Sequence, residues 1–129
     1  LQRFVGRGTA LITFTGARSG REYTTPISYR RDGETVTFTT NRTRRWWRNL
    51  ATQPAVGLRL AGKDHLGSAR VLGIDEALPR FIELMKAQKV IARVNGVEFD
   101  DEGHPDPDQA ASALETTVMI AVELDSQAR

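Results

Sequence analysis

Hydrophobic and polar positions alternate along much of the chain, which is the two-residue period of a half-buried β-strand. Pro26 falls inside one alternating segment, and a proline fits a sheet only at an edge or a bulge. Asp32 and Gly33 form the strongest hairpin signal of the chain. The pattern predicts six strands, at residues 9–15, 22–31, 35–41, 55–60, 65–72 and 116–124.

Two segments repeat their hydrophobic positions with the period of an α-helix. Residues 44–53 predict a short helix that ends before Pro54, because the residue before a proline disfavours helical geometry. Residues 74–90 predict a longer amphipathic helix with Pro79 in its first turn. Residues 95–111 are acidic and aperiodic and contain prolines, and so predict an exposed loop. The hairpins favour a mainly β fold, a small antiparallel β-barrel with helical additions.

The 129 residues, 40% of them hydrophobic, suit a single domain that spans residues 1–129. The absence of cysteine excludes disulfide scaffolds and cysteine nucleophiles, and it favours a reducing, cytoplasmic compartment. No apolar run approaches the roughly 18 residues of a membrane-spanning helix. The first residues carry no secretory leader pattern. The composition therefore indicates a globular domain held together by its hydrophobic core.

The net charge of +2 conceals an asymmetry between the two halves of the chain. Residues 1–60 hold 11 Lys and Arg against 3 Asp and Glu, whereas residues 61–129 hold 7 against 13. Fifteen of the eighteen basic residues are arginine, whose planar guanidinium binds carboxylate or phosphate through paired hydrogen bonds. The first half therefore indicates a surface for a compact anionic ligand. A long nucleic acid is disfavoured, because it would meet the acidic second half.

The sequence offers little support for hydrolytic or metal chemistry. Neither His65 nor His104 has the partners of a catalytic triad or the helical spacing of a zinc site. The acidic residues between 100 and 108 lack the glycine-centred spacing of a calcium loop. We expect a solvated loop there and no metal site.

Two motifs in the basic half carry the candidate chemistry. The turn GARSGR at residues 16–21 offers backbone N–H groups, a hydroxyl and two arginines to an anion, although a solvated hairpin turn explains the same residues. The segment RRWWRN at residues 44–49 places arginines near a helix N-terminus, which attracts anions. Trp46 and Trp47 point about 100° apart around a helix, so one is expected in the core and the other against a planar ligand. A core helix with a polar face, or a nucleic-acid or membrane-surface patch, is the alternative.

At this spacing the two motifs resemble the deazaflavin-dependent nitroreductase and quinone-reductase family of the flavin/deazaflavin oxidoreductase superfamily. The matching segments are GARSGREYTTPISYRRDG and WWRNLATQPAVGLRLAG, within a resemblance over roughly residues 8–75 and the final strand. It implies a homodimeric split β-barrel that binds coenzyme F420, an 8-hydroxy-5-deazaflavin with an anionic phospholactyl-oligoglutamate tail. It also implies hydride transfer from the reduced cofactor to a quinone, enone or nitro compound.

The resemblance assigns cofactor contacts by position, with the glycine turn at the phosphate or tail and the strand residues around the ring. The implied set is Arg18, Ser19, Gly20, Thr25, Pro26, Ser28, Thr39, Thr40, Asn41, Arg42, Arg45, Trp46 and Asn49. No side chain needs to be the catalyst, because the cofactor carries the hydride. Tyr29, Asn41 and Arg45 are the candidates to stabilise negative charge that develops on the acceptor.

The chain departs from the family pattern in one loop and on one strand. Between Asn41 and Trp46 many members carry a longer glycine-rich loop, and Tyr23 and Ser28 replace family residues on the second strand. The compact form approaches that of FMN-binding relatives, so FMN is the competing cofactor. Two other functions stay open: a cofactor carrier without turnover, and a nucleic-acid or anionic-lipid binding module with peripheral membrane contact.

Overall fold

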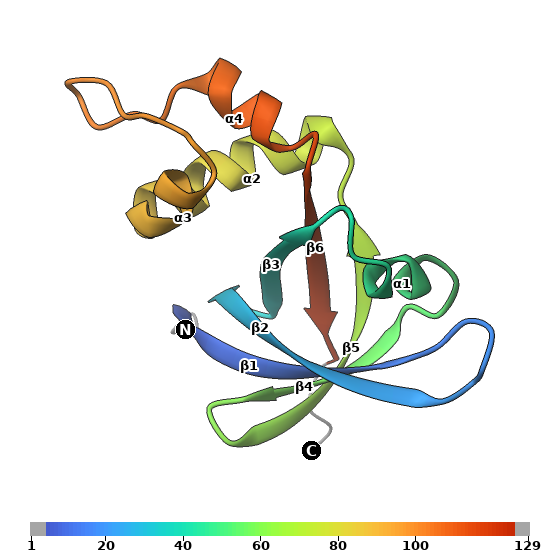
Figure 1. Ribbon diagram of the computed structural model, residues 1–129. Coiled ribbons are helices and arrows are strands. Elements are labelled where there is room, and N and C mark those ends of the chain that lie inside the picture. Colours follow the sequence, from blue (N-terminus) through green and yellow to red (C-terminus); the bar gives the residue numbers. More distant parts are fainter. Residues whose placement is uncertain (1–4, 126–129) are drawn as a thin grey trace.

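The computed structural model describes residues 5–125, and six antiparallel strands dominate it. They form a closed barrel in the order β1-β2-β3-β6-β5-β4 (Figure 1). The strands are β1 (Val5–Thr15), β2 (Glu22–Asp32), β3 (Thr35–Asn41), β4 (Ala55–Leu60), β5 (Lys63–Val71) and β6 (Thr117–Leu124). The predicted mainly β, six-stranded antiparallel barrel is confirmed.

The helices follow the predicted order with two differences. A 3-10 turn η1 (Trp46–Arg48) and helix α1 (Asn49–Thr52) follow β3, and α2 (Ile74–Ala87) follows β5 with Pro79 in its second turn. The long predicted helix is broken at Gln88, whose backbone is not helical, and α3 (Lys89–Val94) begins after it. None of the helices within residues 5–125 has the length and apolar character of a membrane span.

The second difference lies in the stretch 95–111, which was predicted to be a loop throughout. Its end forms helix α4 (Pro107–Ala113). The Asp106 side chain accepts hydrogen bonds from the N–H groups of Asp108 and Gln109, and Pro107 occupies the first helical position. The acidic and proline residues that suggested a loop are the start signal of a helix.

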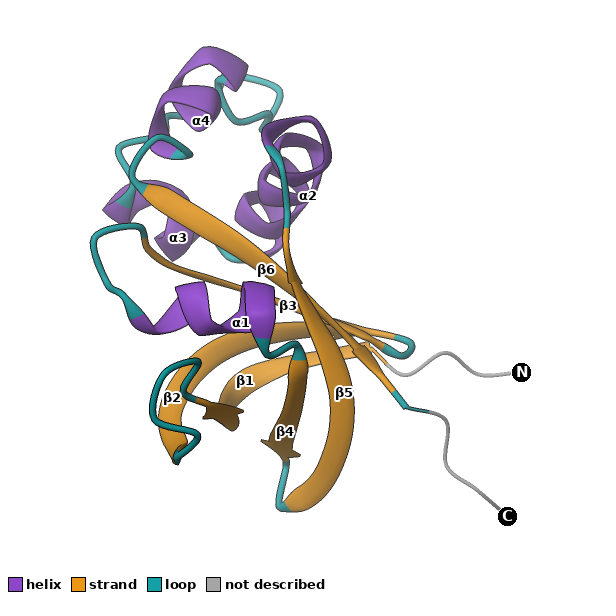
Figure 2. Cartoon of the chain, turned by 90° about the vertical axis from the view of Figure 1, so that its right-hand side faces the viewer, coloured by secondary structure: helices purple, strands orange, loops and turns teal. Residues whose placement is uncertain are grey.

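The last strand, β6, separates two hydrophobic clusters. Val118, Ile120 and Val122 point into the barrel, whereas Met119 and Ala121 pack beneath the helices. Figure 2 shows α2, α3 and α4 gathered at one end of the molecule, beyond the barrel. Because β6 is covered on both faces, it lacks the polar alternation of a half-exposed strand.

Strands β2 and β3 separate after a short ladder. They pair only from Asp32↔Thr35 to Tyr29↔Phe38. Beyond that point β2 pairs with β1 alone, and β3 pairs with β6 alone. Pro26 lies on this free edge of β2, where a missing N–H costs no ladder bond. The predicted edge position of Pro26 is confirmed, and the separation creates an opening in the wall of the barrel.

Strands β5 and β6 approach each other closely at Gly67. A Cβ atom on Gly67 would lie 2.7 Å from the Glu123 carbonyl oxygen and 2.8 Å from a Val122 methyl group. We expect Gly67→Ala to lower the free energy of unfolding by about 1–3 kcal/mol in urea denaturation, because backbone must shift. Gly6→Ala is the control, since its Cβ meets nothing within 4 Å. Equal stability of the two variants would contradict this packing.

Candidate functional site

The opening between β2 and β3 leads into a cavity of about 470 Å³, here called the split pocket. The strand ends form one wall, and residues of α2 and α3 form the other. Eight of the residues singled out by sequence line it: Thr25, Pro26, Ser28, Tyr29, Thr39, Thr40, Asn41 and Trp46. The structure therefore brings together side chains from β2, β3 and η1 that lie far apart in the sequence.

The helical wall of the split pocket was missed by sequence reasoning. Leu84 and Gln88 reach it from the end of α2, and Ile91 and Val94 reach it from α3. Val94, the last residue of α3, is 75% exposed. The hydrophobic pattern of residues 74–90 predicted an apolar helix face. A helix that packs only on the core has the same pattern, so the pattern could not indicate that part of this face lines a pocket.

A second cavity of about 670 Å³, here called the arginine pocket, lies at the end of the barrel beside the glycine turn. Arg18, Ser19 and Asn49, from the predicted set, line it, and so do Arg45 and Arg48. Within residues 5–125 no carboxylate forms an ion pair with these three arginines. The backbone N–H groups of Arg18 and Ser19 also have no acceptor among the described residues. The pocket thus offers several unused hydrogen-bond donors to an anion.

Trp46 is the shared wall of the split pocket and the arginine pocket. Its ring packs against Phe14 and Phe38, with centroids 5.1 Å and 6.0 Å away. Trp47 lines neither cavity. Its ring lies within 5.8 Å of the Arg42 guanidinium, and its Nε1 donates to the Arg42 carbonyl oxygen at 3.3 Å. Of the two tryptophans, Trp46 is therefore the one placed to contact a ligand.

Asn49 joins the glycine turn to the tryptophan segment. Its Oδ1 accepts a hydrogen bond from the N–H of Ala17 at 2.8 Å, and its Nδ2 donates to the Trp46 carbonyl oxygen at 2.9 Å. Both ends of the amide are thereby engaged with backbone. Asn49 holds two walls of the arginine pocket at a fixed separation, beyond the cofactor contact that the resemblance implies.

We expect Asn49→Ala to lower the free energy of unfolding by about 1–3 kcal/mol, because it leaves the Ala17 N–H without its acceptor. Thermal denaturation measures the loss. Thr52→Ala is the control, because its exposed hydroxyl makes only a 3.5 Å contact with the Asn49 carbonyl oxygen. Loss of the same size in both variants would show that the bridge contributes nothing.

Three predicted site residues lie elsewhere than expected. Arg42 lines neither cavity, because its Nη2 donates to the carbonyl oxygens of Leu114 and Thr117. Gly20 also lines neither cavity, and its φ of +70° serves the turn. Arg45 was a candidate for stabilising charge on the acceptor, but it lies in the arginine pocket because successive residues around η1 point in different directions.

Arg44 takes the place in the split pocket that was expected for Arg45. Next to it, the Asn41 Oδ1 accepts hydrogen bonds from the backbone N–H and the hydroxyl of Thr43, at 2.9 Å and 2.7 Å. This arrangement leaves the Nδ2 of Asn41 as a donor. With the serine and threonine side chains of β2 and β3, these groups give the cavity a mixed polar and apolar lining.

The remaining ionisable candidates lie outside both cavities. Burial, and then the nearby charges of Arg31 and Lys63, lower the pKa of His65 on β5. The ligand atoms of Asp100, Glu102 and His104 lie within 4.8 Å of one another on an exposed turn. Hydrogen bonds from the backbone of His104 and Glu102 lower the pKa of the Asp100 carboxyl group. These hydrogen bonds form a turn, and the turn is what brings the three side chains together.

Comparison with known proteins identifies the family of this chain. The family model of the F420H(2)-dependent quinone reductases matches residues 2–98. The chain belongs to this family. No match was found among curated proteins.

Solved structures show the same fold as this quinone reductase family member. A protein of unknown function from Agrobacterium tumefaciens is 18% identical with a TM-score of 0.67; the match covers 92% of this chain and 48%, about half, of that one. An F420-H2 dependent reductase is 18% identical with a TM-score of 0.56, over 88% of this chain and 92% of that one. A pyridoxamine 5'-phosphate oxidase-related, FMN-binding protein from Nostoc punctiforme is 13% identical with a TM-score of 0.62, over 89% and 70%. The architecture is thus the split β-barrel.

Proposed function

We propose that this protein is a reductase that binds coenzyme F420 across the split pocket and the arginine pocket. The observation that carries the proposal is the position of Trp46, whose ring borders both cavities. A planar ring beside Trp46 and an anionic tail among the arginines would occupy adjoining spaces. One ligand with these two parts matches the site better than two unrelated ligands.

The residues of the two cavities fit the cofactor that the family name implies. Beyond Tyr29 and Phe38 the facing edges of β2 and β3 lack strand partners, so their free backbone groups are available to the heteroatoms of the ring. Arg18, Arg45 and Arg48 provide the guanidinium groups for the tail. Within residues 5–125 none of these three guanidinium groups has a carboxylate partner, although Arg48 lies over the Trp47 ring at 5.4 Å. Three such cations suit a tail with several carboxylates better than the single phosphate of FMN, which makes F420 the favoured cofactor.

When bound in its reduced form, the cofactor supplies a hydride to the acceptor, which also takes up one proton and becomes a two-electron-reduced product such as a quinol. The protein orients the two molecules and stabilises the negative charge that develops on the acceptor oxygen. We assign this stabilisation to the guanidinium of Arg44 and the Nδ2 of Asn41. The Tyr29 side chain packs in the barrel core, with its hydroxyl near Gly8 of β1. Ile91 and Val94 exclude water from the helical side of the split pocket.

A homodimer is part of the proposal. Leu11 on β1 and Leu66 on β5 are 43% and 68% exposed, and both belong to the barrel wall that the helices leave uncovered. A second copy would bury these side chains. Light scattering on the purified protein measures the mass directly, and a monomer at micromolar concentration would refute this part.

Titration of the purified protein with oxidised F420 and with FMN tests the cofactor assignment. We expect saturable quenching of tryptophan fluorescence, because Trp46 lies at the site, with a dissociation constant in the micromolar range for F420 and weaker binding of FMN. Binding of neither compound would refute the proposal. Oxidation of reduced F420 with menadione as acceptor then separates a reductase from a carrier, which would bind the cofactor without turnover.

A further inference from the structure

A third cavity lies beside the split pocket, between the β2–β3 hairpin and α2. It has a volume of about 540 Å³ and is called the hairpin pocket here. Arg30, Thr35, Thr37 and Arg80 are among the residues that line it. None of these residues was singled out by the sequence, and none has a role in the function proposed above.

The hairpin pocket and the split pocket are neighbours along the same two elements. On β2, Ser28 lines the split pocket and Arg30 lines the hairpin pocket. These residues are two positions apart on one face of the strand, a separation of about 7 Å. On α2, Leu84 and Arg80 line the two pockets in the same order and are one helical turn apart. A small molecule can therefore reach from one pocket into the other.

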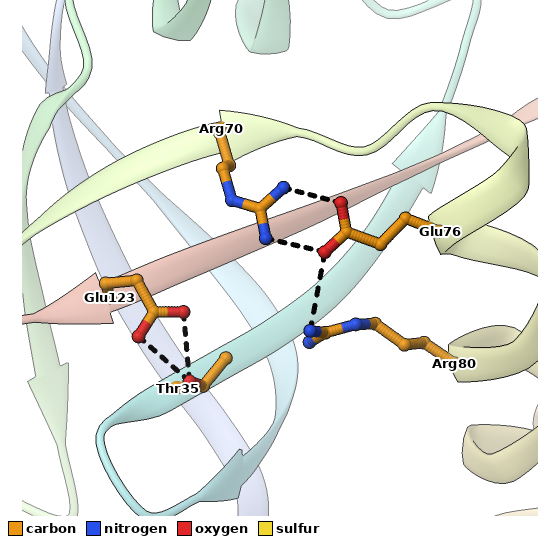
Figure 3. A network of polar contacts seen from close by, with 5 residues as sticks. All are labelled: Thr35, Arg70, Glu76, Arg80 and Glu123. Carbon is orange, nitrogen blue, oxygen red and sulfur yellow. Dashed lines mark hydrogen bonds and ion pairs between the residues drawn. The ribbon is translucent and has the colours of Figure 1, made fainter.

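Two of the residues that line the hairpin pocket, Arg80 and Thr35, belong to the polar network drawn in Figure 3. The Glu76 carboxylate receives two hydrogen bonds of 2.6 Å from Arg70 and lies 3.4 Å from Arg80. The Glu123 carboxylate accepts a hydrogen bond from the Thr35 hydroxyl. These contacts tie α2 to β5 and β6 to β3, and they engage Arg80 on one side of the pocket.

The two acidic residues of the hairpin pocket are engaged as well. Glu83 pairs with Lys86 at 3.2 Å on the surface of α2. Asp32 has an interaction of its own. Neither carboxylate pairs with Arg30, so the charge of Arg30 is not neutralised within its own pocket.

Arg30 is the unsatisfied cation of the hairpin pocket. It is half-buried, and it forms no hydrogen bond or ion pair with any other residue between 5 and 125. Its neighbour across the β1–β2 ladder is Arg7, and like charges in this position are destabilising. Arg7 donates to the carbonyl oxygen of Ala87 at the end of α2, whereas Arg30 has no such acceptor. On the other side Arg30 faces Thr37 of β3, whose hydroxyl has no partner among the described residues.

We propose that the hairpin pocket binds the carboxylate of an acceptor whose electron-poor ring lies in the split pocket. The Arg30 guanidinium donates two parallel N–H bonds to the carboxylate, and the Thr37 hydroxyl donates a further one. This inference rests on the proposed function and makes it more specific, because it names the acceptors as aromatic or quinoid carboxylates. Arg30 is thus a specificity-determining residue, and neutral acceptors bind without its help.

Equilibrium binding by calorimetry tests the subsite without cofactor, using 4-nitrobenzoate and its neutral isostere 4-nitrobenzamide. We expect the wild-type protein to prefer the benzoate, and Arg30→Gln to weaken benzoate binding by about 10- to 100-fold while amide binding stays within about twofold. Thr37→Val should weaken benzoate binding by a smaller factor and keep the strand packing. Arg59→Gln is the matched control, because Arg59 lies on β4 and pairs with Asp64 away from the pocket.

Equal binding of the two compounds to the wild-type protein would overturn the inference, as would an equal loss of both in Arg30→Gln. If Arg30→Gln does not fold, the Thr37→Val and wild-type comparisons still decide the question. Because the measurement needs no F420, failure of the cofactor assignment would leave the benzoate preference intact. Kinetics with reduced F420 then provide a second readout, in which Arg30→Gln raises KM for the benzoate and leaves kcat unchanged.

Discussion

Replacing Trp46 with alanine is expected to abolish F420 binding and to lower the free energy of unfolding by about 2–4 kcal/mol. The stability loss follows because the indole packs on Phe14 and Phe38, and removal of a large aromatic side chain from a core leaves a cavity. The binding loss follows because the same ring is the common wall of the two cavities. Chemical denaturation and F420 titration measure the two effects on one sample.

Trp47→Ala separates these two effects. Trp47 is also half-buried, so its removal costs stability, but it lines neither cavity. We expect Trp47→Ala to keep F420 affinity within about threefold, which is less than 1 kcal/mol. Trp46→Phe, which retains an aromatic ring, should recover most of the stability and part of the affinity. If Trp47→Ala lost F420 binding and Trp46→Ala kept it, the ring of the cofactor would lie against Trp47 and not against Trp46.

The triple variant Arg18→Gln, Arg45→Gln and Arg48→Gln is expected to weaken F420 binding by about 100-fold. Each exposed guanidinium contributes roughly 1 kcal/mol or less to an anion contact in solvent, so three together reach this factor. The wild-type affinity should fall as salt rises, and the variant should respond less. Fluorescence titration at two salt concentrations provides the measurement.

The control for this variant carries the same change in net charge at other places. Arg21→Gln, Arg59→Gln and Arg93→Gln remove three exposed arginines that lie outside the arginine pocket. Their F420 affinity should remain close to the wild-type value. The tail-free compound 8-hydroxy-5-deazariboflavin should bind the wild-type protein and the first variant almost equally. If both triple variants weakened F420 binding equally, the anion would be attracted by the overall positive charge and not bound by a specific site for the tail.

The sequence predicts the barrel well because its signals are local. The alternation in residues 35–41 and the Asp32–Gly33 hairpin depend only on neighbouring residues, and the strand at 35–41 begins and ends where expected. The start of α4 was missed because aspartate and proline, as at Asp106 and Pro107, are favoured in turns as well as at helix starts. Their meaning depends on whether the apolar face that follows can be buried, as Ala110 and Ala113 are.

For the site, the resemblance indicated the strand and tryptophan residues, but the partners of each side chain depend on tertiary contacts. Arg42 and Arg44 are two residues apart and chemically identical. The first reaches carbonyl oxygens at the end of α4 and at the start of β6, whereas the second lines the split pocket. Arg30 gave no signal at all, because its lack of a partner becomes visible only when the opposite wall is in place. Whether a charged side chain has a partner depends on the residues that the fold brings next to it, and the sequence around Arg30 does not show them.

The position of β6 in the chain has a consequence for biosynthesis. This strand leaves the ribosome after all the others, yet it fills the place between β3 and β5, with Thr35 opposite Glu123. Until it emerges, two strand edges and an apolar lining have no cover, and contacts of such long sequence separation form slowly. Newly made chains therefore pass through a stage in which the barrel is open and its apolar lining is exposed, and this stage ends when β6 has been translated and pairs with β3 and β5.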